Sequence, residues 1–270
     1  MKALMGRVLR GLSGIAATLF EPLIATSEGD PESIEYSLEK RPIVCHRLGS
    51  GPLHVLIVGG IHGNEIGTVK LVYRLISQLS REESAWNHLT IHCIPCLNPD
   101  GLAVAQDHPG FFSGGKLGRL NARGVDLNRN FPSQNFTSRS VWAHGKNYQE
   151  STEVFCGETA ASEPEIQALL SHISAFRPEV YVAFHSAGRD VMGSSDALGQ
   201  KLAAAFSKAT NYRLQSHEKG RGLGQTGTAG DWCQENGITY VEVEASSRWG
   251  SDWKKQKAGI QQILKELQAS

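Results

Sequence analysis

The stretch Val55-Leu-Ile-Val-Gly-Gly-Ile-His-Gly-Asn-Glu65 decides how the rest of the chain is expected to fold. It opens with an uninterrupted apolar run, which is typical of a strand buried on both faces of a parallel sheet covered by helices. Two glycines then let the chain turn sharply where that strand ends. His62 and Glu65 follow, at the kind of strand end where open α/β sheets bind ligands. An imidazole and a carboxylate at this spacing suit zinc, but the pattern alone fits a hydrogen-bonded histidine beside a solvated glutamate equally well.

The composition of the 270 residues is that of a globular protein, with 40% hydrophobic and 20% charged residues. One α/β domain of this length is ordinary. The 27 Lys and Arg residues balance the 27 Asp and Glu residues, which argues against a nucleic-acid-binding or strongly basic membrane-binding surface. We therefore expect no nucleic-acid partner, and the sequence leaves the oligomeric state open.

The five cysteines lack zinc-finger spacing and predict buried thiols in a reducing compartment, without a disulfide framework. Cys93 and Cys96 have the spacing of a redox pair, but they lie in a strand-like run, whereas a thioredoxin-type pair lies at a helix start.

The N-terminus imitates a signal peptide, because basic residues precede a short apolar stretch at residues 11–20. No clear cleavage site follows, and the stretch is too short to span a membrane. We expect residues 1–33 to be an extension, either poorly ordered or an amphipathic helix, and residues 34–270 to be a single catalytic domain. A cytoplasmic location is predicted, with the signal-like N-terminus leaving export open.

Strands alternate with helices along the chain, which predicts an α/β fold with a mixed, mostly parallel twisted sheet and helices on both faces. Apolar runs predict strands over residues 34–38, 42–48, 55–58, 89–95, 180–184 and 238–244. Apolar stripes predict helices over residues 67–79, after a cap at Ser162, over 196–210, from about 231, and over 253–267. Residues 106–158 show little periodicity, and so long an irregular stretch indicates a functional loop.

Chemistry-bearing side chains follow three of the predicted strands: His62 and Glu65, then His185, then Glu244. Two histidines and a carboxylate are the protein ligands of a catalytic zinc site, which keeps a fourth position for water. Zinc lowers the pKa of that water, and a further carboxylate takes its proton and passes it to the leaving amine. Glu244 is placed for this role, but Glu242 lies on the same strand face, so the strand alone does not choose between them.

The segment from Gly118 to Pro132, GRLNARGVDLNRNFP, interleaves arginines with asparagines and suits a site that holds anions. Arginine matches a carboxylate with two parallel hydrogen bonds, and asparagine adds an amide donor. An arginine can also stabilise the oxyanion that develops when a carbonyl is attacked. A solvated loop of scattered charges would not explain the glycines and the repeated asparagines.

In order along the chain, these motifs resemble those of the zinc metallocarboxypeptidases. The resemblance runs from about Tyr36 to the C-terminal helix. It is carried by His62-x-x-Glu65, Asn98-Pro-Asp-Gly101, the segment from Gly118 to Pro132, Ser162-Glu-Pro-Glu165, His185-Ser and Glu244. It implies a zinc carboxypeptidase-like catalytic domain that hydrolyses a C-terminal peptide or amide bond of a short peptide.

The same resemblance implies roles for individual residues. The ligands of one Zn²⁺ ion per chain would be His62, Glu65 and His185. Glu244 would be the general base and acid, because the family has a threonine or similar residue where Glu242 stands. Arg119 would polarise the scissile carbonyl. Asn128 and Arg129 would clamp the terminal carboxylate of the substrate.

The HGNE form of the first motif is most similar to the bacterial murein peptide amidases, which cleave γ-D-glutamyl-diaminopimelate bonds in recycled cell-wall peptides. Digestive members of the family carry a tyrosine where this chain has Leu223, so closure of a tyrosine over the substrate is not expected. The position that often sets side-chain preference lies near Gly230, and a glycine there indicates no particular side chain.

Two alternatives stay open at this point. The N-acyl amino acid deacylases of the succinylglutamate desuccinylase and aspartoacylase type also carry HGNE and a D-x-N-R motif. Against them stand three motifs that look like carboxypeptidase features: Asn98-Pro-Asp-Gly101, the full Asn128-Arg-Asn-Phe-Pro132 and Ser162-Glu-Pro-Glu165. A non-catalytic binding module could have kept the fold, but here every zinc ligand and the general base are present.

Overall fold

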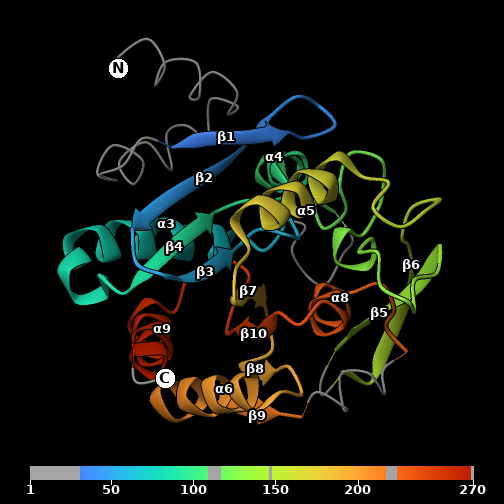
Figure 1. Cartoon of the computed structure of the whole chain (residues 1–270). Helices are drawn as coiled ribbons and strands as arrows, with labels where there is room; N and C mark the ends of the chain where they lie inside the picture. The colour runs from blue at the N-terminus through green and yellow to red at the C-terminus, as the bar shows by residue number, and fades with distance from the viewer. Residues whose placement is uncertain (1–30, 109–116, 146–147, 217–223, 269–270) are drawn as a thin grey trace.

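The computed structural model describes residues 31–108, 117–145, 148–216 and 224–268, which build an eight-stranded sheet with helices on both faces (Figure 1). The strand order is β1-β2-β4-β3-β7-β10-β8-β9, and β5 and β6 pair as a separate small sheet. The central strands β4, β3, β7 and β10 run parallel, whereas β1–β2, β2–β4 and β8–β10 are antiparallel pairs. The predicted mixed, mostly parallel sheet is confirmed.

All six predicted strands are present, and the apolar composition of each central strand matches its burial. Every residue of β7 is buried, as expected for a strand covered by helices on both faces. The strands of the main sheet are Glu32–Tyr36 (β1), Pro42–Gly49 (β2), Leu53–Val58 (β3), Leu89–Ile94 (β4), Val180–Ser186 (β7), Asp190–Gly193 (β8), Arg213–Gln215 (β9) and Thr239–Ala245 (β10).

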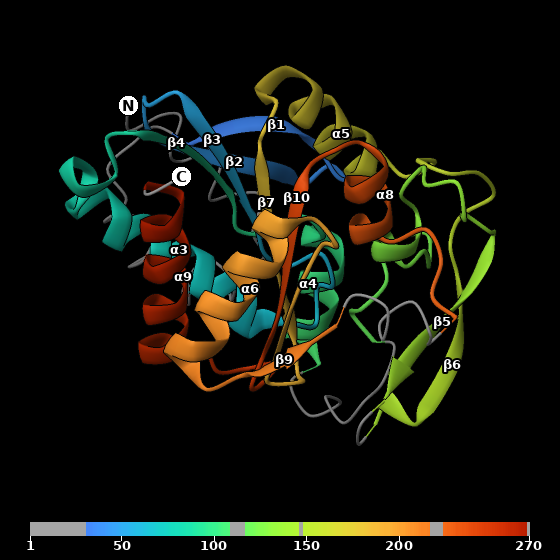
Figure 2. The ribbon, with the colours of Figure 1, turned by 60° about the horizontal axis from the view of Figure 1, so that its bottom comes forward.

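The helices pack on the sheet in two layers, seen on opposite sides of the strands in Figure 2. Their bounds are Ile66–Arg81 (α3), Pro99–Asp107 (α4), Pro164–Phe176 (α5), Ala197–Thr210 (α6), Ala229–Glu235 (α8) and Trp253–Gln268 (α9). The apolar stripes of α3, α6 and α9 form one core with one face of the sheet, and those of α5 and α8 form a second core with the other. Burial of these stripes stabilises the domain more than helix propensity does.

The parallel strands β3, β7 and β10 end at the same edge of the sheet. Val58 pairs with Ala183 in the β3–β7 ladder, and Glu244 pairs with His185 in the β7–β10 ladder. The segment after β3 therefore meets the ends of β7 and β10, which brings together side chains that are far apart in the sequence.

The stretch expected to be irregular contains more regular structure than its sequence pattern indicates. Just before it lies α4, a helix that the sequence analysis did not predict; Asn98 caps this helix, because its side chain accepts a hydrogen bond of 2.8 Å from the backbone N–H of Gly101. Two strands, Arg139–His144 (β5) and Glu150–Phe155 (β6), pair as a hairpin. The expectation of a Ser162 cap is wrong by one residue: Glu163 is the N-cap of α5, and the Ser162 hydroxyl donates to the Glu163 carboxylate instead.

The predicted extension over residues 1–33 lies, up to residue 30, outside the described residues, and β1 begins at Glu32. Within the described part of the chain, no helix has the length and hydropathy needed to cross a bilayer. All five cysteines are free, and four of them are buried. The cytoplasmic location stays a prediction.

Candidate active site

The first two predicted zinc ligands lie in the tight turn that joins β3 to α3. Glu65 is the N-cap residue of α3, and its backbone N–H donates to the carbonyl of His62 at 3.1 Å. The turn passes so close to α4 that a Cβ atom at Gly63 would lie 2.1 Å from the backbone nitrogen of Leu102. Only glycine fits at that position, and this close approach fixes where His62 and Glu65 point.

The structure brings together the three predicted ligands, which are all buried. The Nδ1 atom of His62 lies 3.1 Å from Oε1 of Glu65 and 3.3 Å from Nδ1 of His185. The Nδ1 atom of His185 lies 3.4 Å from Oε2 of Glu65. Three nitrogen and oxygen donors therefore face a common point from three directions.

This donor set fits a zinc ion. Tetrahedral ligands at ordinary zinc–nitrogen and zinc–oxygen distances are about 3.3 Å apart, which is close to the separations seen here. The buried Oε2 atom of Glu65 has no hydrogen-bond partner, as expected of an oxygen whose partner is a bound cation. Burial alone would raise the pKa of Glu65, but His62 and His185 outweigh burial and lower it, so the carboxylate is available as a ligand.

Asp126 is a site residue that the sequence did not single out. Its Oδ1 atom lies 3.2 Å from Nε2 of His62, on the side of the ring away from the ligand atom. Its Oδ2 atom accepts a hydrogen bond of 2.9 Å from Nε of Arg119 and forms an ion pair with Nη2 of the same residue, also at 2.9 Å. Burial would raise the pKa of Asp126, but the charges of Arg119 and His62 lower it well below its ordinary value. A carboxylate behind a metal-binding histidine fixes its tautomer and orientation.

Arg119 is held from two sides. Besides the hydrogen bond and ion pair with Asp126, its guanidinium lies 4.5 Å from the centroid of the Trp142 ring. Its Nη1 atom is 3.9 Å from Oε1 of Glu65, and the side chain lines the cavity described below. The arginine is therefore positioned before any substrate arrives.

Asn128 and Arg129 lie in a short 3-10 helix, Leu127–Arg129, which Asp126 caps by accepting a hydrogen bond from the Asn128 backbone. The amide oxygen of Asn128 accepts from the backbone N–H of Ala229 at 3.0 Å, which fixes the orientation of its side chain. Arg129 donates from Nε to the carbonyl of Val141 at 3.0 Å and from Nη1 to the carbonyl of Asn128 at 2.6 Å. Both side chains line the cavity.

Glu242 and Glu244 both face this cavity from β10, but their partners differ. The Tyr240 hydroxyl donates to the Glu242 carboxylate at 3.0 Å. The Glu244 carboxylate, in contrast, makes no hydrogen bond to any residue that the structure describes. Burial, together with the charges of Glu65 and Glu242, raises the pKa of Glu244 above its ordinary value. Glu244 is thus a carboxylate with high proton affinity, open to the space in front of the zinc ligands.

The seven predicted site residues line one cavity of about 390 Å³. It also contains residues that the sequence pattern did not indicate, notably Tyr148, Asp190 and Arg248. Tyr148 donates to Asp190 at 2.9 Å, and Nη1 of Arg248 is buried without a hydrogen-bond partner. No spacing rule could have found these residues, because loops remote in sequence bring them to the cavity.

Two expected departures from the family pattern have different outcomes. Leu223 lies outside the described residues. Gly230 lies in α8 and does not line the cavity; a Cβ atom there would meet the Tyr240 ring at 3.1 Å. Met192, Gln215 and Gln225 are among the uncharged residues that line the cavity instead.

Known proteins resemble this chain in sequence and in fold. The chain is 29% identical to murein peptide amidase A of Escherichia coli K12 over 192 residues, which are 70% of this chain and 69% of that protein. It is 30% identical to the protein of the same name from Vibrio campbellii over 196 residues, 70% of this chain and 68% of that one. The crystal structure of murein-tripeptide amidase from Escherichia coli O157 superimposes with a TM-score of 0.63 and 26% identity, covering 87% of this chain and 91% of that one. The zinc carboxypeptidase family model matches residues 30–268. The chain belongs to the zinc carboxypeptidase family and is a zinc-dependent peptidase or amidase.

Proposed function

We propose that this enzyme removes the C-terminal residue of a short peptide, with His62, Glu65 and His185 holding the zinc ion. The observation that carries the proposal is the meeting of these three ligands with Glu244 and a pair of anion-binding side chains in one cavity. A purely structural zinc site has four protein ligands and needs neither a free carboxylate nor a pocket.

The chain supplies the groups that move a proton. When bound, zinc polarises the scissile carbonyl and lowers the pKa of a water molecule. The Glu244 carboxylate accepts the proton of the attacking water, and it later donates this proton to the nitrogen of the leaving amine. Its raised pKa suits both steps, because a group of higher proton affinity is a stronger base when ionised. Glu242 is occupied by the Tyr240 hydroxyl and is the weaker candidate.

Arg119 stabilises the transition state in this proposal. Asp126 and Trp142 hold its guanidinium at the cavity wall next to Glu65, so it needs no rearrangement when negative charge develops on the carbonyl oxygen. Removing one donor that is oriented in advance in this way lowers kcat by about 10²- to 10³-fold.

Asn128 and Arg129 bind the free carboxylate of the substrate's last residue. Arg129 is buried and is fixed by two backbone carbonyls, and Asn128 is fixed by Ala229. The Arg129 guanidinium and the Asn128 amide favour an anionic group at one end of the cavity. A substrate whose terminal carboxylate binds there presents its last peptide bond for hydrolysis.

The proposed substrate class is a murein peptide. The support is the activity after which the relatives are named, murein peptide amidase A and murein-tripeptide amidase, together with their similarity over most of this chain. Arg248 adds a cation to the cavity beyond Arg119 and Arg129, which favours a substrate with more than one carboxylate.

A substrate screen tests this proposal. Zinc-loaded enzyme is incubated in parallel with a murein tripeptide, a set of unmodified dipeptides and N-succinylglutamate, and the products are identified by mass spectrometry. We expect release of the C-terminal residue from the murein tripeptide, with slower or no turnover of the others. Faster turnover of dipeptides would keep the carboxypeptidase and reject the murein substrate. Turnover of N-succinylglutamate alone would establish a deacylase and reject the proposal.

A further inference from the structure

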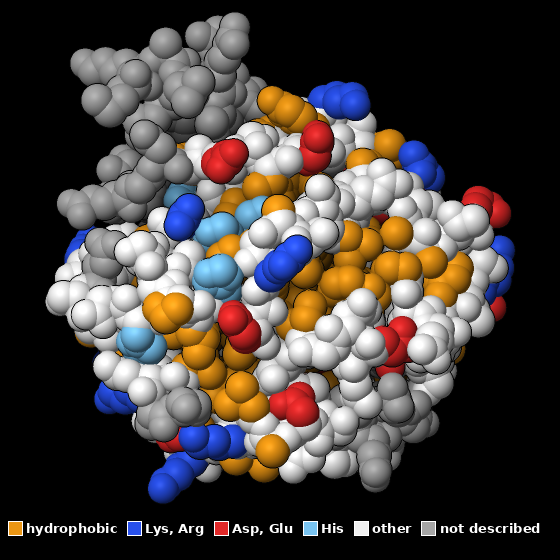
Figure 3. Space-filling view, viewed as in Figure 1, with side chains coloured by type: hydrophobic (Ala, Val, Ile, Leu, Met, Phe, Trp, Pro, Cys, Tyr) orange, Lys and Arg blue, Asp and Glu red, His pale blue; other side chains and the backbone are white. Residues whose placement is uncertain are grey.

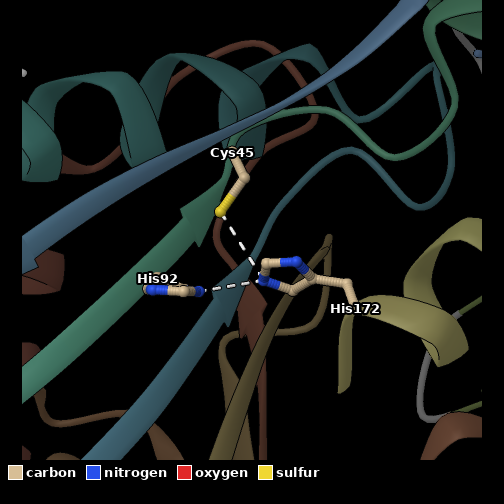
Figure 4. Close-up of side chains that lie close together, drawn as sticks. All are labelled: Cys45, His92 and His172. Carbon is tan, nitrogen blue, oxygen red and sulfur yellow. Dashed lines mark hydrogen bonds between the residues drawn. The ribbon is translucent and has the colours of Figure 1, made fainter. Parts of the chain in front are cut away.

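A second group of potential metal ligands lies between the sheet and α5. Cys45 comes from β2, His92 from β4 and His172 from α5, and all three side chains point toward one another (Figure 4). Arg47 pairs with His92 across the β2–β4 ladder. Side chains alternate along a strand, so Cys45 and Arg47 lie on the same sheet face as His92.

The distances in this group match those of metal ligands. Nδ1 of His92 lies 3.0 Å from Nε2 of His172, and Sγ of Cys45 lies 3.7 Å from the same Nε2. Around tetrahedral zinc, two imidazole nitrogens are about 3.3 Å apart and a nitrogen and a thiolate sulfur are about 3.6 Å apart. Small shifts of these side chains would therefore place all three atoms around one ion.

Hydrogen bonding alone accounts poorly for the cluster. It explains the contact between the two imidazoles, but it leaves the Cys45 thiol with two long contacts, 3.7 Å to His172 and 3.9 Å to the carbonyl of His46. Three metal-ligating side chains converge on one point without a strong hydrogen-bond network to hold them there.

Solvent reaches the cluster through a hollow of about 310 Å³ that His92 and His172 help to line. Histidine side chains gather over β2, β4 and α5 on the face shown in Figure 3. This hollow shares no lining residue with the active-site cavity. An ion could therefore enter here without passing through the catalytic site.

The protonation states favour a ligand role for the imidazoles. Burial lowers the pKa of His92 to about 3 and also lowers the pKa of His172, so both rings are neutral and carry a lone pair at neutral pH. Arg47, which lines the hollow, adds to the shift of His92. Burial, together with the charge of Glu32, which pairs with Cys45 across the β1–β2 ladder, raises the pKa of the Cys45 thiol to about 12, so this ligand is protonated until a metal ion displaces its proton.

We propose that Cys45, His92 and His172 bind a second zinc ion, in addition to the single catalytic ion that the sequence predicts. Imidazole and thiolate are the ligands that zinc prefers, and three of them leave one position for water or a carboxylate. Binding replaces the S–H proton of Cys45, which leaves to solvent, with the metal. The proton in the hydrogen bond between Nδ1 of His92 and Nε2 of His172 moves to the other nitrogen of the ring that carries it. Each neutral ring then keeps one N–H, on Nε2 of His92 and on Nδ1 of His172, and both facing nitrogens are free to bind the metal.

Cobalt substitution separates the two sites, because only the second contains a sulfur ligand. Metal-free enzyme is titrated with Co²⁺, and the near-ultraviolet thiolate-to-cobalt charge-transfer band is recorded. We expect this band in the wild type, its loss in Cys45→Ser, and its preservation in the matched control Cys96→Ser, whose thiol lies outside the cluster. Absence of the band in the wild type, or an unchanged band in Cys45→Ser, would overturn the proposal.

Zinc stoichiometry gives an independent reading. After saturation with zinc and gel filtration, we expect two zinc ions per chain in the wild type and in Cys96→Ser, and one in Cys45→Ser. His172→Gln, at a partly exposed helix position, is a second variant if Cys45→Ser does not fold; it is also expected to bind one ion. Peptidase activity should persist in both one-zinc variants, which shows that the catalytic ion is the one retained. One zinc ion per wild-type chain, or two in both variants, would reject the second site.

Discussion

Replacing Asp126 by asparagine tests whether this carboxylate organises the active site. The side chain is completely buried and has three partners. Its Oδ1 atom lies 3.2 Å from Nε2 of His62 and accepts from the Asn128 backbone N–H, and its Oδ2 atom accepts a hydrogen bond from Nε of Arg119 and forms an ion pair with Nη2. In either orientation of an asparagine amide, its NH₂ group faces a donor, Arg119 on one side or the backbone N–H of Asn128 on the other. No rotation of the new side chain restores the lost contacts.

The size of the effect follows from these contacts. Removing one partner of a buried ion pair destabilises a protein by about 3–5 kcal/mol. Loss of the hydrogen bond from Arg119 and of the contact with His62, at about 1.5–3 kcal/mol for each hydrogen bond to a charged group, gives a similar figure. Loss of the carboxylate behind His62 should weaken zinc binding by about 10- to 100-fold. The pKa of Asp126 is lowered in the folded protein, so its stabilisation is present at neutral pH and is lost as the pH falls toward that pKa.

Urea unfolding of the metal-free protein at pH 7 gives the stability change, and competition with a chelator gives the zinc affinity. Asp107→Asn, at an exposed position at the end of α4, is the control and should change neither quantity. In the double variant Asp126→Asn/Arg119→Met, the destabilisation should be smaller than the sum of the two single changes, because no charge is left unpaired. A loss below about 1 kcal/mol for Asp126→Asn with unchanged zinc affinity would refute this role.

Three further predictions concern other parts of the site. Hydrogen bonds and charge from Glu65 outweigh burial and raise the pKa of His185 to about 9. The protonated ring thus stabilises the metal-free protein below about pH 6.5 and loses this effect as the pH rises through about 9. Zinc affinity, measured by competition with a chelator, should increase about tenfold per pH unit up to about pH 9, because the proton competes with zinc for the ring. A zinc affinity that does not change with pH would contradict the raised pKa of His185. Gly63→Ala should lower the free energy of urea unfolding by about 3 kcal/mol or more, because the new Cβ atom overpacks the turn. The control Gly124→Ala, where a Cβ atom meets nothing but φ is +79°, should lower it by only about 1 kcal/mol. Equal losses in the two variants would show that a small backbone shift relieves the close contact at Gly63. Arg129→Gln should raise KM for a free C-terminal carboxylate about 10- to 100-fold and abolish the preference over the C-terminal amide; a preserved preference would place the carboxylate elsewhere.

The sequence predicts those parts of the fold in which burial and pattern agree. The apolar run at Val55–Val58 and the run at Val180–Phe184 form the buried parallel strands that were expected. Asp196 caps the predicted helix α6 by accepting from the Gly199 N–H at 2.8 Å. Because consecutive parallel strands end at one edge of a sheet, the convergence of His62, His185 and Glu244 also follows from the pattern.

Short strands and polar hairpins are not accessible to that reasoning. The strands β8 and β9 have four and three residues, too few for an alternation to show. The strand β6 is mostly exposed and polar, and only its pairing with β5 makes it a strand. The residues Asn98-Pro-Asp-Gly101 have the composition of a turn, but in the structure they begin the helix α4. The pattern does not distinguish the two, because the same residue types that favour turns also cap helices.

The residues that support the site are missed for a related reason. Asp126 stands two positions before Asn128 in the segment that the sequence singles out, but its role depends on contacts with His62, 64 residues away. The cluster of Cys45, His92 and His172 has no spacing signature, because three separate elements contribute one residue each. Such groups become visible only when the tertiary structure places their atoms together.

The measurement that tests the central claim most directly compares Glu244→Gln with Glu242→Gln in zinc content and in turnover of a peptide substrate. We expect both variants to keep the zinc content of the wild type, because neither residue is a proposed ligand. Glu244→Gln should lower kcat by about 10²- to 10⁴-fold, whereas Glu242→Gln should stay within about tenfold of the wild type. Near wild-type turnover in Glu244→Gln with full zinc content would contradict the proposed mechanism, and a loss confined to Glu242→Gln would transfer the role of the base to that residue.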